Sequence, residues 1–72
     1  MSIVSEIASF TETFLVVAET RSFSKAAQQL SMSPSAVSQK ISQLEDKLHV
    51  TLFDRSTRPL INTPEARMLK ET

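Results

Sequence analysis

The pairs Ser33-Pro34 and Thr63-Pro64 constrain the fold of this chain more than any other feature. A Ser or Thr side chain accepts a backbone N–H at a helix N-terminus, and proline suits the first helical position because its missing N–H would have no partner there. Each pair therefore predicts that a helix begins at its proline. After the first pair, apolar side chains recur at helical spacing at Val37, Ile41, Leu44 and Leu48. This pattern predicts a helix from about residue 34 to about residue 48 with one buried face.

Two further helices are predicted in the first part of the chain. The first is expected over residues 4–19, because apolar residues lie on one helical face at Ile7, Phe10, Phe14 and Val17. The second is expected over residues 23–30, with Ser22 or Ser24 as its N-cap. Its inner face consists of Ala26, Ala27 and Leu30. The two adjacent alanines add little bulk and so allow another helix to approach closely.

The segment after residue 48 is predicted to form a β-hairpin. Segments 50–55 and 60–62 are rich in residues that favour strands, and the turn Ser56-Thr57-Arg58-Pro59 separates them. Two helices joined by a turn of three or four residues form a helix-turn-helix, and the hairpin adds a wing. The predicted fold class is thus mainly α with a small β-hairpin, a winged helix-turn-helix over residues 1–63. Residues 64–72 are expected to form a last helix of barely two turns that is cut short.

The chain contains no glycine, so other residues must make its turns. His49 follows the predicted third helix where a left-handed residue would end it, and His tolerates that conformation better than most residues. We therefore interpret His49 as a structural cap and not as a ligand or a catalyst. The four phenylalanines are expected in the core, at Phe10, Phe14, Phe23 and Phe53.

The composition argues against several classes of function. With no cysteine and a single histidine, the chain is expected to bind no metal. The longest apolar run, residues 14–18, is too short to span a bilayer, and no signal peptide is recognised. We find no glycine-rich phosphate loop and no nucleophile with a visible base, so we expect neither catalysis nor a cofactor. The expected location is the cytoplasm.

The net charge is zero, but the charges are unevenly distributed along the chain. Residues 1–20 carry three acidic side chains and no basic one, whereas residues 21–58 carry six basic and three acidic side chains. The basic middle weakly favours an anionic partner, although a mixed solvated surface explains the charges equally well.

The outer face of the predicted third helix lacks the charged residues that usually fill a solvated helix face. The side chains expected to point away from the core are Ser35, Gln39, Ser42, Gln43 and Asp46, with Ser38 and Lys40 on the flanks. Gln pairs with adenine in the major groove and Ser bonds to several bases, so this face fits the reading of base edges in duplex DNA. The helix N-terminus also suits a phosphate. The alternative is that these are ordinary surface residues.

Four basic residues are candidate contacts to the DNA backbone. Arg55 and Arg58 flank the predicted hairpin turn, where a wing would meet phosphates or the minor groove. The alternative for Arg55 is an ion pair with Asp54. Lys25 and Lys40 are candidate phosphate contacts, and a solvated role suits them nearly as well. The alternative function for the whole domain is a winged helix that contacts another protein.

Five short motifs stand in a fixed order along the chain. They are Phe14…Ala18-Glu19, Ser22-Phe23…Ala26-Ala27…Leu30, Ser33…Ala36-Val37-Ser38…Ile41…Leu44-Glu45, Leu52-Phe53-Asp54-Arg55 and Thr63-Pro64. Together they resemble the N-terminal DNA-binding domain of the LysR-type transcriptional regulators of bacteria, over about residues 10–69. By position, the resemblance implies DNA contacts at Ser33, Pro34, Ser35, Ser38, Gln39, Lys40, Arg55 and Arg58.

The resemblance also implies how the protein would bind DNA and assemble. The third helix would enter the major groove of double-stranded promoter DNA, and the wing would touch the backbone or minor groove. The protein would act as a homodimer or tetramer through a long linker helix. A larger effector-binding domain would follow, and only that domain would bind a small molecule.

The chain departs from the family at several positions. The family usually has glycine at three positions of this chain, namely Arg21, His49 and Ala66. Arg21 and His49 are expected to adopt left-handed turn conformations at some cost, whereas Ala66 is expected to be helical. Uncharged residues replace the family's usual outer-face arginines, at Gln39, Ser42 and Gln43, which predicts weaker phosphate attraction. Asn62 replaces a usual leucine, so the packing of the wing against the linker is expected to differ.

Overall fold

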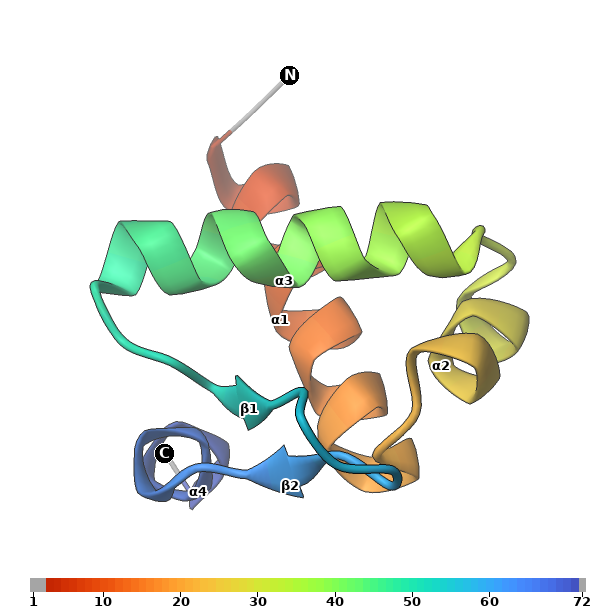
Figure 1. Cartoon of the computed structure of the whole chain (residues 1–72). Helices are drawn as coiled ribbons and strands as arrows, with labels where there is room; N and C mark the ends of the chain where they lie inside the picture. Colours follow the sequence, from red (N-terminus) through yellow and green to blue (C-terminus); the bar gives the residue numbers. More distant parts are fainter. Residues whose placement is uncertain (1–2, 72) are drawn as a thin grey trace.

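The computed structural model describes residues 3–71, with side chains from Ser9 to Lys70. In this part of the chain the elements follow in the order α1 (Ile3–Thr20), α2 (Phe23–Leu30), α3 (Pro34–Leu48), β1 (Phe53–Asp54), β2 (Ile61–Asn62) and α4 (Pro64–Glu71) (Figure 1). The predicted winged helix-turn-helix is therefore confirmed. The side chain of Ile7 and the helix end at Thr72, both part of the predictions, lie outside what the structure describes.

The helices begin where Ser and Thr side chains cap them. Ser22 Oγ accepts the Lys25 N–H at 3.2 Å, so Ser22 and not Ser24 is the cap of α2. Ser33 Oγ accepts the Ala36 N–H at 3.1 Å with Pro34 as the first residue of α3. Thr63 Oγ1 likewise accepts the Ala66 N–H at 3.2 Å at the start of α4.

Three turns place a residue other than glycine in the left-handed region. The φ angles are 54° at Arg21, 56° at Ser31 and 57° at His49. Arg21 and His49 were expected there; Ser31, which ends α2, is an addition that the sequence did not signal. The His49 N–H donates to the Glu45 carbonyl oxygen, which confirms His49 as the cap of α3.

The core lies where α1 meets α2, α3 and the wing (Figure 1). It is made of Phe14, Val17, Ala18, Ala26, Ala27, Val37, Ile41, Leu52, Phe53, Leu60 and Ala66. Ala26 and Ala27 are fully buried, as expected for a close helix approach. Ala66 is helical, as expected, and it is buried as part of this core.

Some predicted core residues lie at the surface. Leu48 is 43% exposed, because the last turn of α3 extends past α1 and borders Leu15 and Leu69 at the edge of the domain (Figure 1). Phe10 and Phe23 are only partly buried. Lys40 and Lys47 lie over the Phe10 ring, and Arg55 lies over the Phe23 ring.

The wing is shorter than predicted. Phe53 pairs with Asn62 and Asp54 with Ile61 in an antiparallel register, whereas residues 50–52 lie outside the strand. The reason is that α3 satisfies their backbone groups: the Glu45 carboxylate accepts the Leu52 N–H at 2.7 Å. This bond joins the C-terminal part of α3 directly to the segment that leads into the wing.

Candidate nucleic-acid interface

The N-terminal half of α3 presents a small, uncharged surface. Ser33, Pro34, Ser35 and Gln39 are exposed, as the sequence predicts for residues that read base edges. Ser33 uses one lone pair of its oxygen to cap the helix, so its hydroxyl proton and its second lone pair remain for a ligand. This end of α3 can therefore donate and accept hydrogen bonds without bulky side chains in the way.

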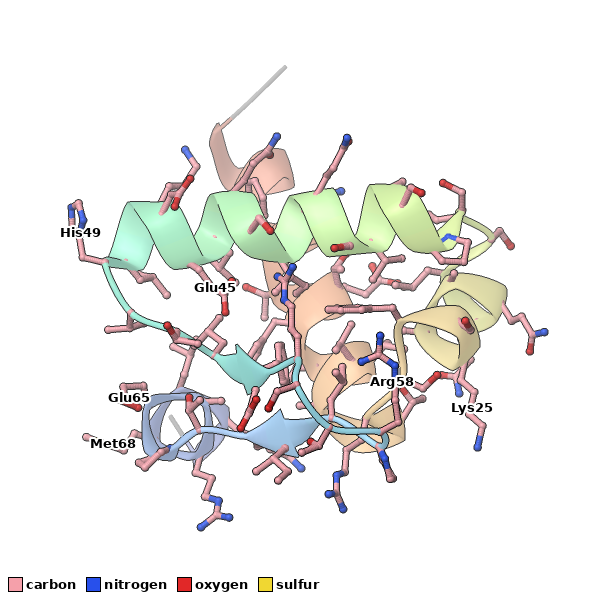
Figure 2. All side chains as sticks on the ribbon, viewed as in Figure 1. Lys25, Glu45, His49, Arg58, Glu65 and Met68 are labelled. Atoms are coloured by element: carbon pink, nitrogen blue, oxygen red, sulfur yellow. The ribbon has the colours of Figure 1, made fainter. Side chains whose placement is uncertain are left out.

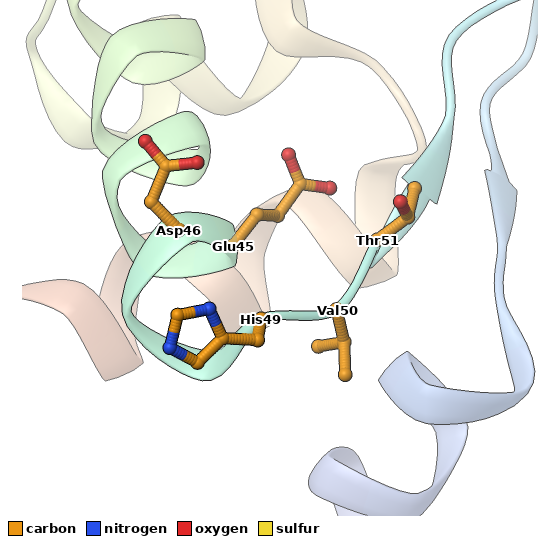
Figure 3. Close-up of a pocket in the computed structure, with 5 residues that line it drawn as sticks. All are labelled: Glu45, Asp46, His49, Val50 and Thr51. Carbon is orange, nitrogen blue, oxygen red and sulfur yellow. The ribbon is translucent and has the colours of Figure 1, made fainter.

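The C-terminal half of α3 has a different outer surface. Gln43, Asp46 and Lys47 are exposed there. Figure 3 shows a polar pocket at this end, lined by Glu45, Asp46, His49, Val50 and Thr51. Asp46 brings a negative charge to the outer face, which disfavours DNA phosphates, so the surface suited to DNA lies toward the N-terminus of α3.

Arg55 does not form the ion pair with Asp54 that was the alternative to a DNA contact. Its Nη1 donates to Ser38 Oγ at 3.2 Å, and its Nη2 donates to Ser42 Oγ at 3.1 Å and pairs with Glu45 Oε1 at 3.2 Å. Asp54 instead accepts from the hydroxyl and backbone N–H of Ser56, at 2.5 and 2.9 Å. Arg55 therefore ties the wing to α3.

Ser38 and Ser42 share one edge of α3 with Glu45. They stand at i, i+4 and i+7, a spacing that places side chains in a row along a helix. Ser42 was expected to point freely outward, but it is half-buried because Arg55 lies against this row. The guanidinium also packs on the Phe23 ring, with Cζ 5.1 Å from the ring centroid. Arg55 thus contacts α2 and α3 from the wing.

Glu45 is a residue of the site whose role the sequence did not reveal. Its Oε2 accepts the Leu52 N–H at 2.7 Å and the Phe53 N–H at 3.4 Å, while Oε1 faces Arg55. Figure 2 shows its side chain directed from α3 toward β1. The signal in the sequence was the helical spacing of Glu45 from Ser38 and Ser42. The wing residues that bond to Glu45 could not be recognised from the sequence, because they meet it only in the tertiary fold.

Lys40 lies on the opposite flank of α3. Its ammonium donates to Ser9 Oγ and lies 5.8 Å from the centroid of the Phe10 ring. Lys47 lies at the same distance from that ring. Lys40 therefore bridges α3 to α1, a contact that the sequence did not indicate.

Lys25 and Arg58 are the most accessible of the predicted basic contacts. Both are exposed, and Figure 2 shows them on the α2 side of the molecule. Among the described residues, Arg58 Nη1 donates only to carbonyl oxygens of its own loop, Arg55 O at 3.1 Å and Thr57 O at 3.3 Å. Arg58 also borders a cavity of about 160 Å³ with residues 22–24, so the wing loop lies beside the start of α2.

From Ile3 to Glu71, no helix has the length and hydropathy needed to cross a membrane. Over the same stretch, no three side chains of His, Cys, Asp or Glu are grouped to bind a metal ion.

Curated proteins of similar sequence are transcriptional regulators. The HTH-type transcriptional regulator DsdC of Escherichia coli (strain K12) is 51% identical over 55 residues, which are 76% of this chain and 18% of DsdC. The HTH-type transcriptional regulator AceR of Acinetobacter baumannii is 52% identical over 58 residues, which are 81% of this chain and 20% of AceR. The chain thus spans about a fifth of the length of these relatives.

Solved structures of similar fold include complexes with DNA. The BenM DBD in its complex with benA site 1 DNA has a TM-score of 0.83 and 34% identity, over 86% of this chain and 70% of that chain. Vibrio fischeri DarR in complex with DNA has a TM-score of 0.84 and 32% identity, over 99% of this chain and 23% of that chain. The model of the bacterial regulatory helix-turn-helix protein, lysR family, matches residues 9–67. This chain therefore belongs to the LysR family of bacterial transcriptional regulators, as a winged helix-turn-helix domain.

Proposed function

We propose that this domain binds double-stranded promoter DNA sequence-specifically, with α3 in the major groove and the wing on the backbone or minor groove. The observation that carries the proposal is the exposed, uncharged surface of Ser33, Pro34, Ser35 and Gln39 at the start of α3. Small polar side chains let a helix approach base edges closely and bond to them. BenM and DarR, whose domains share this fold, form complexes with DNA, which supports DNA as the partner.

The contacts divide into two roles. Ser35, Ser38, Gln39 and Ser42 are proposed to read bases, and Ser33 with Pro34 is proposed to seat the helix N-terminus. Lys25 and Arg58 are proposed to bind phosphates, because both are exposed and Arg58 bonds only within its own loop. Lys40 is proposed as a weaker phosphate contact, since Ser9 and Phe10 already engage its ammonium.

The whole regulator extends beyond this domain in our proposal. Residues 1–63 form the DNA-binding unit, and residues 64–72 form the first turns of a linker helix that joins two or four copies. A small-molecule effector would bind a separate domain, and the protein would work in the bacterial cytoplasm. We assign no catalytic step and no cofactor to this chain.

The experiment that tests the proposal is an amide-resolved NMR titration of the chain with a random-sequence duplex at low salt. Low salt matters because phosphate contacts dominate non-specific affinity. We expect shifts at Lys25 and at residues 33–42 and 55–58. Shifts elsewhere, or none from a folded sample, would contradict the proposal and favour a protein-binding winged helix.

Two variants separate the two roles. Arg58→Ala should weaken binding to every duplex and reduce the salt slope by about one. Gln39→Ala should relax the preference at one base pair and leave the salt slope unchanged. Equal effects of both variants on all sequences would contradict the assignment of roles.

A further inference from the structure

We propose that Arg55 is a positioning residue for base recognition, which orients the hydroxyl groups of Ser38 and Ser42 so that they act as hydrogen-bond donors toward DNA. This inference rests on the proposed function of α3. It changes the role expected for Arg55, from a phosphate contact of the wing to a residue that acts through the recognition helix. It also predicts which bases the two serines select.

The chemistry follows from the hydrogen-bonding capacity of the groups. A guanidinium carries only donors, so Ser38 Oγ and Ser42 Oγ must both accept from Arg55, at 3.2 and 3.1 Å. Each hydroxyl has one proton and two lone pairs, and Arg55 occupies one lone pair. The nearby positive charge makes the oxygen a poorer acceptor for a second partner and the O–H a better donor. The proton of each serine is therefore the group best suited to meet a ligand.

The guanidinium itself is held on several sides. Glu45 Oε1 accepts from Nη2 at 3.2 Å, and the Phe23 ring packs against the planar group at 5.1 Å. Glu45 is fixed in turn by the Leu52 N–H at 2.7 Å, and its side chain is only 16% exposed. Because the partners come from α2, α3 and the wing, the orientation of Arg55 is set before any DNA arrives. Little side-chain entropy is then lost on binding.

The two serines border the surface proposed to read bases. At 3.6 residues per turn, Ser42 lies about 20° around the helix from Ser35, and Ser38 lies about 60° from it on the same side. Both therefore flank the exposed Ser35 and Gln39 surface on its wing side. A base pair contacted by that surface is also within reach of their hydroxyl groups.

Donor hydroxyls select for acceptors on base edges. In the major groove guanine offers N7 and O6, adenine offers N7 and thymine offers O4, whereas cytosine offers only an amino donor. We therefore infer that the bases facing Ser38 and Ser42 are guanine, adenine or thymine, and that cytosine is rejected there. Without Arg55, each hydroxyl can rotate to accept from cytosine, and the discrimination is lost.

The test measures base preference with the whole chain. The preferred site is first selected from a pool of randomised duplexes, and affinities are then measured for every single base-pair change in it. We expect Ser38→Ala and Ser42→Ala each to lose about five- to tenfold discrimination against cytosine at one base pair, the worth of one hydrogen bond. Arg55→Lys should lose the same discrimination at both base pairs, with an unchanged salt slope because the charge remains.

Arg58→Ala is the matched control. It removes an arginine from the same loop that bonds only to backbone carbonyl oxygens, so it should lower affinity evenly and keep the base preference. Adding Ser38→Ala to Arg55→Lys should cause no further loss at the Ser38 base pair, since both act through one hydroxyl. If Arg55→Lys kept the wild-type preference, or if Arg55→Ala lowered all affinities evenly and reduced the salt slope, Arg55 would be a phosphate contact and the inference would be wrong.

The double variant Ser38→Ala/Ser42→Ala keeps the test valid if Arg55 variants unfold. It retains the Arg55–Glu45 pair, and its folding is checked by the amide spectrum. An unchanged preference at both base pairs in this variant would overturn the inference while leaving the proposed function intact. If the wild-type chain bound no duplex at low salt, the proposed function and this inference would fail together.

Discussion

Arg21 and Leu60 are joined by two hydrogen bonds across 39 positions of the chain. Arg21 Nε donates to the Leu60 carbonyl oxygen at 2.6 Å, and the Leu60 N–H donates to the Arg21 carbonyl oxygen at 2.9 Å. Leu60 is buried in the core just before β2. The junction between α1 and α2 therefore anchors the returning strand of the wing.

Substitutions at Arg21 should separate two effects on stability, the hydrogen bond from the Arg21 side chain to Leu60 and the strain of the Arg21 backbone. Arg21 has a φ of 54°, and a left-handed residue other than glycine costs about 1–2 kcal/mol. Arg21→Gly removes both the strain and the side-chain bond, so the free energy of unfolding should change by less than about 1 kcal/mol. Arg21→Ala removes the bond and keeps the strain, so it should be less stable than Arg21→Gly by about 1 kcal/mol. Urea unfolding measures the stabilities of the two variants. An alanine variant as stable as the glycine variant would contradict this account.

His49 offers the simpler case, because its side chain is exposed and lies outside the core of the described residues. His49→Gly relieves the strain of φ 57° and should raise the free energy of unfolding by about 1 kcal/mol. The helix-ending N–H bond to Glu45 is a backbone bond and remains. His49→Ala serves as the control and should give no gain. A shift of the urea midpoint in both variants alike would show that the side chain, and not φ, determines the effect.

The order of the helices could be predicted because their signals are local. Ser33-Pro34 and Thr63-Pro64 carry the cap and the first helical residue side by side, and both starts are confirmed. The left-handed turn at His49 was also predictable, since a helix ended there in a chain without glycine. In each case the physical cause lies within a few residues of its effect.

The wing side of the site could not be predicted because its contacts are long-range. Arg55 meets Ser38 and Glu45, which are far from it along the chain, and its sequence neighbour Asp54 turns to Ser56 instead. The exposure of Leu48 has a similar origin, since the apolar pattern of a helix does not say where the neighbouring helix ends. The DNA contacts themselves stay predictions.

The carboxylate of Asp54 gives a prediction about pH. The Ser56 hydroxyl, and then the Ser56 backbone N–H, keep the pKa of Asp54 below its ordinary value of 3.8. A lowered pKa stabilises the folded chain above pH 3.8, and this contribution is lost as the pH falls through the folded-state pKa. Ser56→Ala removes the larger cause, so the pKa of Asp54 should rise toward 3.8 in an NMR titration of its carboxyl carbon. Thr57→Ala, whose hydroxyl donates to the Pro59 carbonyl oxygen, should leave it unchanged.

Glu45 should be the carboxylate on α3 whose loss weakens the domain most. Glu45→Ala leaves the Leu52 N–H without its acceptor in a residue that is fully buried, and it leaves Arg55 without its ion pair. An unpaired buried donor costs about 1–3 kcal/mol, so we expect the free energy of unfolding to fall by about 2–3 kcal/mol.

Glu45→Gln shows which interaction of Glu45 contributes more to stability, the hydrogen bond from the Leu52 N–H or the ion pair with Arg55. The amide oxygen can still accept the Leu52 N–H, so this variant should lose only about 1 kcal/mol and keep the Leu52 amide resonance near its wild-type position. Asp46→Asn, an exposed neutralisation on the next residue of the same helix, should change stability by less than about 0.5 kcal/mol. Urea unfolding and the Leu52 amide shift measure these effects together. If Glu45→Gln were as unstable as Glu45→Ala, the ion pair with Arg55, and not the bond to the wing backbone, would be the main link between α3 and the wing.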